Sequence, residues 1–414
     1  MTIKMVSVHT FIFICIFMAL FSSEVQSAQK EYSIYIDADF TGAKQSSHSI
    51  KQGIITALAE VNNEVQNFKF KLIDKNHRAN SLRSKKNLQA YLEDDKALLV
   101  FSGLHSPPLL SNKTFINNEK ILLLDPWAAA GPITRAKSNE NWIFRLSIDD
   151  SNAGTFIVNR SINEGFKKAH ILLEDTGWGK SNEKTMNLAL AEHGLKPVGI
   201  SWFNWGLGVN QAKLILHSIA ESEADVIFFV GNAPEGKVFS KAMVALPESL
   251  KIPIRSHWGI TGGDFSQVIT KQDRAMLNLQ FIQTNFTFLN KNLSKFETSV
   301  LELAKANNIG INDKYDIKAH TGFVHSYDLT KILIAAINQA GLTGNKQDDK
   351  IAIHQALTNL RAPVQGLLKN YQQPFSIYSQ SNLNAHEALT TTDYAMGAYD
   401  MDDNVVLINS IKED

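Results

Sequence analysis

Cysteine is almost absent from this sequence: its 414 residues contain only Cys15, which lies in an apolar run near the N-terminus. We expect that run to be removed as a leader, which leaves a mature chain without a thiol. Such a chain has no disulfide, no thiolate metal site and no cysteine nucleophile. A lipoprotein would carry its cysteine just after the apolar run, so we expect no lipidation.

An excess of charge of either sign is also absent, because 41 Lys and Arg residues balance 41 Asp and Glu residues. Nucleic-acid-binding proteins normally present a basic face, so we predict no nucleic-acid partner. The hydrophobic share of 44% is that of an ordinary globular protein. The length favours two lobes over a single core.

Catalytic motifs are missing as well. Gly177–Ser181 (GWGKS) resembles the end of a phosphate-binding loop, but Glu174 stands where that loop needs its first glycine, and a carboxylate there repels phosphate. Neither the G-x-S-x-G turn of serine hydrolases nor the H-E-x-x-H zinc motif occurs. We therefore predict that the protein is not an enzyme and uses no cofactor.

Side chains suited to metal binding or acid–base chemistry lack a supporting spacing. His320 and His325 have no carboxylate at ligand spacing, so we interpret them as structural or surface residues. We interpret four acids as solvated loop residues rather than a catalytic pair: Asp149, Asp150, Asp175 and Asp264. We expect no metal site.

The first 27 residues have the pattern of a secretory signal peptide. Lys4 supplies a positive charge, Phe11–Phe21 is an apolar core too short to span a membrane, and Val25–Ser27 precedes a cleavage site at Ala28. An uncleaved anchor is the alternative. The pattern predicts secretion through a cleaved signal peptide at residues 1–27.

One apolar stretch organises the rest of the chain. Ala97–Phe101 (ALLVF) has no polar alternation, which is typical of a central strand buried on both faces of a parallel sheet. The run stops at Ser102-Gly103, and Ser106-Pro107 then begins a predicted helix. Open α/β sheets bind ligands at such strand-to-helix turns, although every α/β domain has several of them.

Strands and helices alternate in two successive series, which predicts an α/β fold with two lobes. Predicted strands include Tyr32–Ile36 and Lys168–Leu173, and predicted helices include Ser49–Val61 and Gly322–Ala340. The tail is expected to form short strands at Phe375–Tyr378 and 404–408. We expect the first lobe to contain residues 28–148 and 285–374, and the second to contain residues 149–284 and 375–414.

Tryptophans gather in loops that follow predicted strands. Trp127, Trp178 and Trp258 lie in three such loops, and Trp202–Trp205 follows a fourth. Any one of them is more often a loop anchor than a ligand contact. Four such loops in two lobes favour a lined cleft, whose aromatic walls would suit an apolar side chain or a cationic group.

Short motifs, taken in order, resemble those of the type I periplasmic solute-binding proteins, in the branch of leucine-binding-like proteins that serves branched-chain amino-acid ABC transporters. The motifs are Phe40–Ala43, Asp74, Phe101–Ser106, Phe144–Leu146 with Asp149, Glu174–Gly179, and Tyr327-Asp328 followed by Ala335–Gly341 and Ala356-Leu357. They span nearly all of the mature chain. The resemblance implies two Rossmann-like lobes with parallel sheets, joined by three crossover strands, that close on a ligand.

Carried over by position, the resemblance implies ten ligand-binding residues: Gly103, His105, Ser106, Trp127, Ala128, Ala129, Trp178, Asn232, Trp258 and Thr261. The Gly103–Ser106 turn would hold a ligand carboxylate, and Ala128–Ala130 would offer backbone groups. The family's amino-acid binders place an acid in the last loop to hold the ligand ammonium. Here Ile260-Thr261 occupies that loop, and the nearest acid is Asp264.

The resemblance implies a periplasmic substrate-binding protein, expected to be a monomer, that delivers a small molecule to the membrane permease of an ABC transporter. The ligand class is an amino acid or a related small carboxylate or amine. The alternative is a periplasmic sensor that presents its ligand to a membrane histidine kinase or cyclase. A periplasmic hydrolase would need a catalytic dyad that the sequence does not show.

Overall fold

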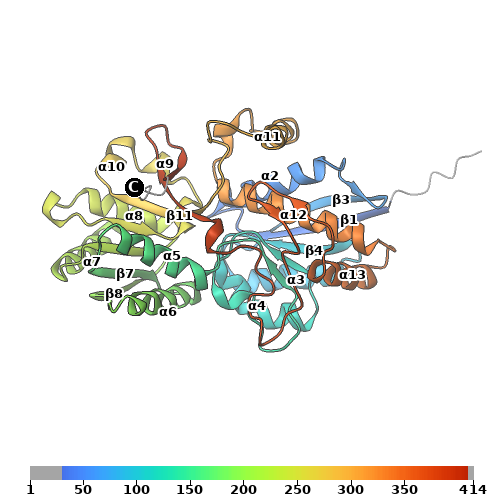
Figure 1. Cartoon of the computed structure of the whole chain (residues 1–414), viewed down its shortest axis with the longest axis horizontal. Helices are drawn as coiled ribbons and strands as arrows, with labels where there is room; N and C mark the ends of the chain where they lie inside the picture. Colours follow the sequence, from blue (N-terminus) through green and yellow to red (C-terminus); the bar gives the residue numbers. More distant parts are fainter. Residues whose placement is uncertain (1–29, 409–414) are drawn as a thin grey trace, which may run out of the picture.

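The computed structural model describes residues 30–408 as two lobes that lie side by side, each built on one mainly parallel sheet with helices packed against it (Figure 1). This confirms the α/β class and the two-lobed architecture. The predicted signal peptide and Cys15 lie outside the described residues.

The first lobe contains a six-stranded sheet in the order β2-β3-β1-β4-β5-β6, in which only the β2–β3 pair is antiparallel. Its strands are β1 (Lys30–Ala38), β2 (Glu64–Val65), β3 (Phe68–Asn76), β4 (Ala97–Ser102), β5 (Leu123–Asp125) and β6 (Ile143–Arg145). All six residues of β4 are buried. The apolar run therefore forms the interior strand that the sequence predicts, covered on both faces.

The second lobe contains a seven-stranded sheet in the order β15-β14-β11-β10-β9-β7-β8. Its strands are β7 (Ala169–Glu174), β8 (Gly199–Phe203), β9 (Val226–Val230), β10 (Ile254–Ser256), β11 (Leu279–Thr284), β14 (Tyr394–Tyr399) and β15 (Val405–Ile408). The last two strands join the edge antiparallel, while the other pairs are parallel. A separate hairpin consists of β12 (Val364–Gln365) and β13 (Asn370–Tyr371).

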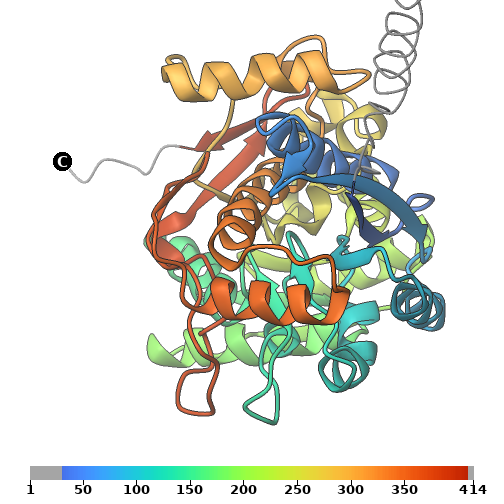
Figure 2. The ribbon, with the colours of Figure 1, turned by 90° about the vertical axis from the view of Figure 1, so that its right-hand side faces the viewer.

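Helices pack against both sheets. Those of the first lobe are α2 (Lys44–Ala59), α3 (Ser81–Glu93), α4 (Ser106–Asn118), α11 (Lys295–Asn307), α12 (His320–Ala340) and α13 (Lys346–Thr358). Those of the second are α5 (Asp150–Asn163), α6 (Gly177–Glu192), α7 (Val209–Glu221), α8 (Ala233–Val244), α9 (Phe265–Val268) and α10 (Lys271–Ala275). Seen from the end of the first lobe, α13 lies in front and α11 runs along the top (Figure 2).

The chain passes between the sheets at three places: between β6 and α5, after β11, and before β14. The segment before β14 first runs beside β6, where Arg145 N donates to His386 O at 2.9 Å and Ala388 N donates to Arg145 O at 3.0 Å.

The predicted strand at Phe375–Tyr378 is wrong, because this stretch is a loop. Its Tyr378 hydroxyl donates to Ala136 O at 2.9 Å, so the side chain anchors the loop to the first lobe.

Four charged side chains, of which Arg135 is partly exposed and the others are buried, join two of these crossings. We call them the hinge ion cluster: Arg135, Arg145, Asp149 and Glu387. The guanidinium of Arg145 is fully buried and lies 2.6 Å from Glu387 Oε1 and 2.8 Å from Asp149 Oδ1. Arg135 Nη2 lies 2.6 Å from Asp149 Oδ2. The interpretation of Asp149 as a solvated loop acid is therefore wrong, because two arginines hold it inside the protein.

Candidate functional site

Loops that follow parallel strands of both sheets meet where the two lobes touch. They enclose a cavity of about 10 Å³, which we call the cleft cavity. Six of its lining residues are Ser106 and Ala129 from the first lobe, and Glu174, Trp178, Asn232 and Trp258 from the second. Five of these six are among the ligand-binding residues predicted from the sequence. The site lies at the carboxyl ends of the strands, as in other open α/β sheets.

A second hollow of about 160 Å³ adjoins the cleft cavity and shares Leu104 and Asn232 with it. His105, another predicted site residue, lines this hollow together with Trp205. Their ring centroids lie 5.7 Å apart. Since His105 follows β4 and Trp205 follows β8, this contact also spans the two lobes.

Four predicted site residues do not line either hollow: Gly103, Trp127, Ala128 and Thr261. A Cβ on Gly103 would come within 2.7 Å of Ala38 Cβ, so glycine here allows close packing against β1. The hydroxyl of Thr261 donates to Trp258 O at 2.8 Å, within its own loop. These two residues support the site's walls.

Aromatic rings fill the space between the lobes. Trp127 and Trp258 pack edge-to-face with centroids 6.1 Å apart, and both are buried. Trp127 also packs against α12, where a Cβ on Gly322 would come within 2.6 Å of its ring. Trp258 lies 5.2 Å from the ring of His325. These contacts between rings explain why the cleft cavity is so small.

Glu174, at the end of β7, has a fully buried carboxylate in the cavity wall. It accepts hydrogen bonds from the Thr176 hydroxyl at 2.7 Å, from Trp205 Nε1 at 3.1 Å and from Asn232 Nδ2 at 3.2 Å. Burial raises the pKa of Glu174 to about 7, although the hydrogen bonds from Thr176 and Trp205 lower it. The carboxyl group therefore titrates near neutral pH.

Asp150, at the start of α5, is the second buried acid at this junction, and we call Asp150 and Glu174 the cleft acids. Its Oδ1 accepts from Trp178 Nε1 and from His257 Nε2, both at 3.1 Å. His257 Nδ1 accepts from Trp258 N at 3.0 Å, so the proton of the neutral ring lies on Nε2. The interpretation of Asp150 as a solvated acid is wrong, because its side chain is completely buried.

The Ala128–Ala130 segment has partners within the protein for most of its backbone groups. Arg145 Nη1 donates to Ala128 O at 3.2 Å and to Ala130 O at 2.9 Å. Asp150 N donates to Ala129 O at 3.0 Å, and Ala130 N donates to Ser106 Oγ at 3.2 Å. The hinge ion cluster thus positions one wall of the cleft cavity.

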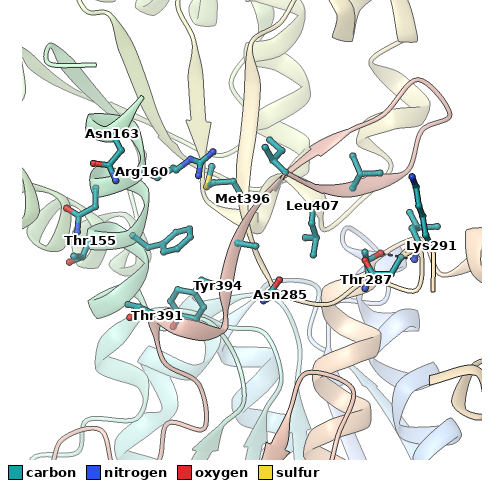
Figure 3. Close-up of a pocket in the computed structure, with 17 residues that line it drawn as sticks. Thr155, Arg160, Asn163, Asn285, Thr287, Lys291, Thr391, Tyr394, Met396 and Leu407 are labelled. Atoms are coloured by element: carbon teal, nitrogen blue, oxygen red, sulfur yellow. Dashed lines mark hydrogen bonds between the residues drawn. The ribbon is translucent and has the colours of Figure 1, made fainter. Parts of the chain in front are cut away.

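A larger hollow lies elsewhere, beside the crossings after β11 and before β14 (Figure 3). Its volume is about 940 Å³, and α5, β14, β15 and the chain after β11 line it. Arg160, Asn163, Tyr394 and Met396 are among its lining residues. None of the predicted site residues lines it.

Sequence reasoning did not select Glu174, Asp150, His257, Trp205 or Glu235 as site residues. Glu174 counted against a phosphate loop and formed part of the Glu174–Gly179 motif, and its place directly after a buried strand and before Trp178 was the available signal for a site residue. Trp205 and His257 also follow strands, and the aromatic pattern points to them. The burial of Asp150 has no local signal, because it depends on a contact with a loop more than 100 positions away.

Residues 30–408 lack two features that would point to other functions. No three His, Cys, Asp or Glu side chains in this range are grouped as metal ligands. No helix in the same range has the length and apolar character needed to cross a membrane.

Comparison with known proteins gives a consistent family and fold. A family model described as "Periplasmic binding protein" matches residues 38–373. No curated protein sequence matches the chain. A type 1 periplasmic binding protein from Bordetella pertussis is 16% identical, with a TM-score of 0.75 over 92% of this chain and 100% of that one.

Two other solved structures were determined with ligands. A solute-binding protein of an ABC transporter from R. palustris, in complex with 4-hydroxybenzoate, is 16% identical, with a TM-score of 0.72 over 92% of this chain and 96% of that one. LivJ from Streptococcus pneumoniae, in complex with isoleucine, is 18% identical, with a TM-score of 0.71 over 92% of this chain and 100% of that one. At these identities the likeness shows a shared fold.

Proposed function

This chain belongs to the periplasmic binding protein family, and on that premise we propose that it captures a small molecule between its two lobes and delivers it to the permease of an ABC transporter. Members of the family are solute-binding proteins rather than enzymes, which agrees with the missing catalytic motifs. The proposal includes export of the chain to the periplasm by residues 1–27 and action as a monomer.

One observation carries the proposal: a single enclosed cavity takes its walls from loops of both sheets. Ser106 and Ala129 belong to one lobe, while Trp178, Asn232 and Trp258 belong to the other. A solute that contacts both sets of residues favours the closed arrangement over any open one. For the lobes we propose the division expected from the sequence, with residues 28–148 and 285–374 in one and 149–284 and 375–414 in the other.

The closed cavity holds roughly the volume of one water molecule. A solute of the size bound by the structural neighbours therefore needs the lobes to separate first. We infer a bending motion at the three crossings, in which the hinge ion cluster stays intact while the contacts between the tryptophan-bearing loops break. The solute would have the size of a single aromatic ring or a short amino-acid side chain.

The absence of cysteine from the predicted mature chain makes a test of this motion straightforward. Leu82 on α3 and Leu214 on α7 are 73% and 72% exposed and lie on different lobes. We expect the Leu82→Cys/Leu214→Cys protein, labelled with a fluorescent donor and acceptor, to change its energy transfer when a solute binds. The solutes would come from a thermal-shift screen of amino acids, aromatic acids and amines.

A matched control places both labels on the second lobe, at Leu188 on α6 and Leu214 on α7. Energy transfer in this pair should stay constant, because α6 and α7 pack on the same sheet. A screen in which solutes raise the melting temperature but leave the inter-lobe pair unchanged would contradict capture between the lobes.

A further inference from the structure

We propose that the captured solute is a small organic cation, with its positive charge against the carboxylate of Glu174 and the indole rings of Trp178 and Trp258. This inference rests on the proposed function, since it names the chemistry of that same site. All three side chains line the cleft cavity.

The buried carboxylate of Glu174 has no positively charged partner among the described residues. Among residues 30–408, the partners of its carboxylate are a hydroxyl, an indole and an amide, all of them neutral. A buried carboxylate without a positive partner is costly, and a cationic solute supplies that partner when the lobes close.

Asp150 is the second buried acid at the cleft that lacks a positively charged hydrogen-bond donor within residues 30–408. Its hydrogen-bond donors are the indole of Trp178 and the neutral ring of His257, so its charge is also unbalanced. Its other oxygen, Oδ2, is buried and has no hydrogen-bond partner in the described protein. Trp178 thus connects the two cleft acids, because its ring lines the cavity beside Glu174 while its N–H binds Asp150.

The hollow that adjoins the cleft cavity, and shares Leu104 and Asn232 with it, is also acidic. Its acidic residues are Asp39, Glu235 and Asp264. Lys237 lies 2.5 Å from Asp264, and His105 lies 3.4 Å from Asp39. Glu235 accepts a hydrogen bond from Gly206 N at 3.2 Å and interacts with His105 and Lys237 only through their charge, without an ion pair of its own in the described part of the chain. Acidic residues therefore exceed basic ones in the lining of this hollow, which attracts cations and repels anions.

The turn that was expected to hold a ligand carboxylate offers few hydrogen-bond donors to an anion. Helix α4 begins there with Ser106, Pro107 and Pro108. A helix N-terminus binds anions through its free backbone N–H groups, and the two prolines remove two of these donors. The Ser106 hydroxyl already accepts a hydrogen bond from Ala130 N. The turn is therefore a poor carboxylate site.

An organic cation fits these walls better than a metal ion does. Indole rings attract ammonium groups through the negative faces of their π-systems, whereas they are not metal ligands. No metal-ligand group occurs in residues 30–408. The 4-hydroxybenzoate bound by one structural neighbour carries the opposite charge, so the proposal separates this chain from that protein.

Calorimetric titration of the purified protein with four probes tests the charge of the solute. Choline and benzylamine are the cations, 3,3-dimethyl-1-butanol is the neutral isostere of choline, and benzoate is the anion. We expect at least one cation to bind, with the neutral isostere about thirtyfold weaker or worse than choline if choline binds, because the isostere loses the cation–π and carboxylate attraction. Benzoate should not bind.

A matched pair of variants assigns the effect to Glu174. Glu174→Gln keeps the shape of the side chain and removes its charge, whereas Asp175→Asn removes the same charge from the exposed neighbouring residue. We expect Glu174→Gln to weaken cation binding about thirtyfold or more, and Asp175→Asn to change it less than about twofold. Circular dichroism checks that both variants are folded.

The outcomes separate this inference from the proposed function. Equal binding of choline and its neutral isostere, tighter binding of benzoate, failure of both cations at millimolar concentration, or equal effects of the two variants would overturn the organic cation. If benzoate or leucine then changed the energy transfer between the lobes, capture between the lobes would stand with another solute. If no solute changed it, both proposals would fail.

Discussion

Asp149 and Asp150 are adjacent in the sequence and both buried, yet they belong to regions of opposite character. Asp149 lies in the hinge ion cluster, where two arginines face two carboxylates. Asp150 lies at the cleft cavity, where its donors are an indole and a neutral imidazole. Helix α5 begins between them, with Asp149 as its N-terminal cap. A single peptide unit therefore separates a charge-balanced region from an acidic one.

The comparison distinguishes two uses of buried charge. At the hinge, each charge has its counter-charge within the chain, so the cluster serves to hold the crossings and the Ala128–Ala130 wall in place. At the cleft, the counter-charge is missing among the described residues. Natural proteins tolerate such an imbalance where a ligand completes it, which is why buried, perturbed acids are frequent at functional sites.

The largest effect should follow from breaking the balance at the hinge. Arg145→Met leaves the carboxylates of Asp149 and Glu387 buried with only Arg135 as a positive partner. We expect the free energy of unfolding to fall by about 3–5 kcal/mol, the usual cost of removing one partner of a buried ion pair. Urea denaturation followed by circular dichroism measures it.

The matched control for this variant is Lys168→Met, which removes a cation from the exposed pair with Glu223. We expect no measurable change in its urea midpoint, because solvent screens the exposed pair. Equal midpoints for Arg145→Met and the wild-type protein would mean that the hinge ion cluster is not the structural element described above.

Removing the charge of a cleft acid should raise the free energy of unfolding, whereas Arg145→Met lowers it. The pKa of Glu174 is about 7 in the folded protein and lies near its ordinary value in the unfolded chain, so the folded protein holds an extra proton between these values. Stability is therefore lost as the pH rises through this range. We expect Glu174→Gln to stabilise the protein without solute by about 2 kcal/mol at pH 8 and by less than about 1 kcal/mol at pH 5.

Urea midpoints of both proteins at pH 5 and pH 8 test this sign. Glu235 and Asp150 are charged neighbours that raise the pKa of Glu174, and both remain in the variant, so the difference between the proteins isolates Glu174. Asp175→Asn should show no such gain at pH 8. A Glu174→Gln protein that is less stable than wild type at pH 8 would show that the carboxylate is already compensated.

Much of the two sheets could be predicted from sequence, because buried strands have local signals. The run Ala97–Phe101 predicted its interior strand, and the order of short motifs indicated the family. Five predicted residues line the cleft cavity because loops after parallel strands converge wherever they occur.

The cleft acids could not be predicted in the same way. Whether an acid is solvated or buried depends on what packs over it, and Asp150 is covered by Trp178, 28 positions along the chain, and by His257, 107 positions along it. The strand predicted at Phe375–Tyr378 failed for a related reason. Its alternation matched a strand, but the backbone of Ser376 pairs with Ala385 across a loop instead.

A smaller effect should follow from removing an uncharged hydrogen bond between the lobes. Gly131 N, in the first lobe, donates to Ser181 Oγ on α6 at 3.2 Å. Ser181→Ala removes this hydrogen bond only in the closed form. We expect the ratio of closed to open protein to fall about fivefold, corresponding to about 1 kcal/mol, in the energy transfer of the Leu82/Leu214 pair.

Ser161→Ala is the control, because the Ser161 hydroxyl donates to Ile157 O at 2.8 Å within α5 and does not cross between the lobes. It should leave the energy transfer unchanged. A shift in both variants would mean that packing within the second lobe, rather than a contact between lobes, sets the equilibrium.

The smallest effect tests whether the first turn of α4 contributes to the charge preference of the cleft. The Pro107→Ala/Pro108→Ala variant restores two backbone N–H groups beside the cavity, which makes this helix end more favourable to anions by about 0.3–1 kcal/mol. We expect binding of the cationic probe, measured by calorimetry, to weaken about two- to fivefold. Pro247→Ala, at an exposed position remote from the cavity lining, should leave it unchanged. Unchanged cation binding in the double variant would mean that the cleft acids alone set the charge preference, and that the prolines serve only to begin the helix.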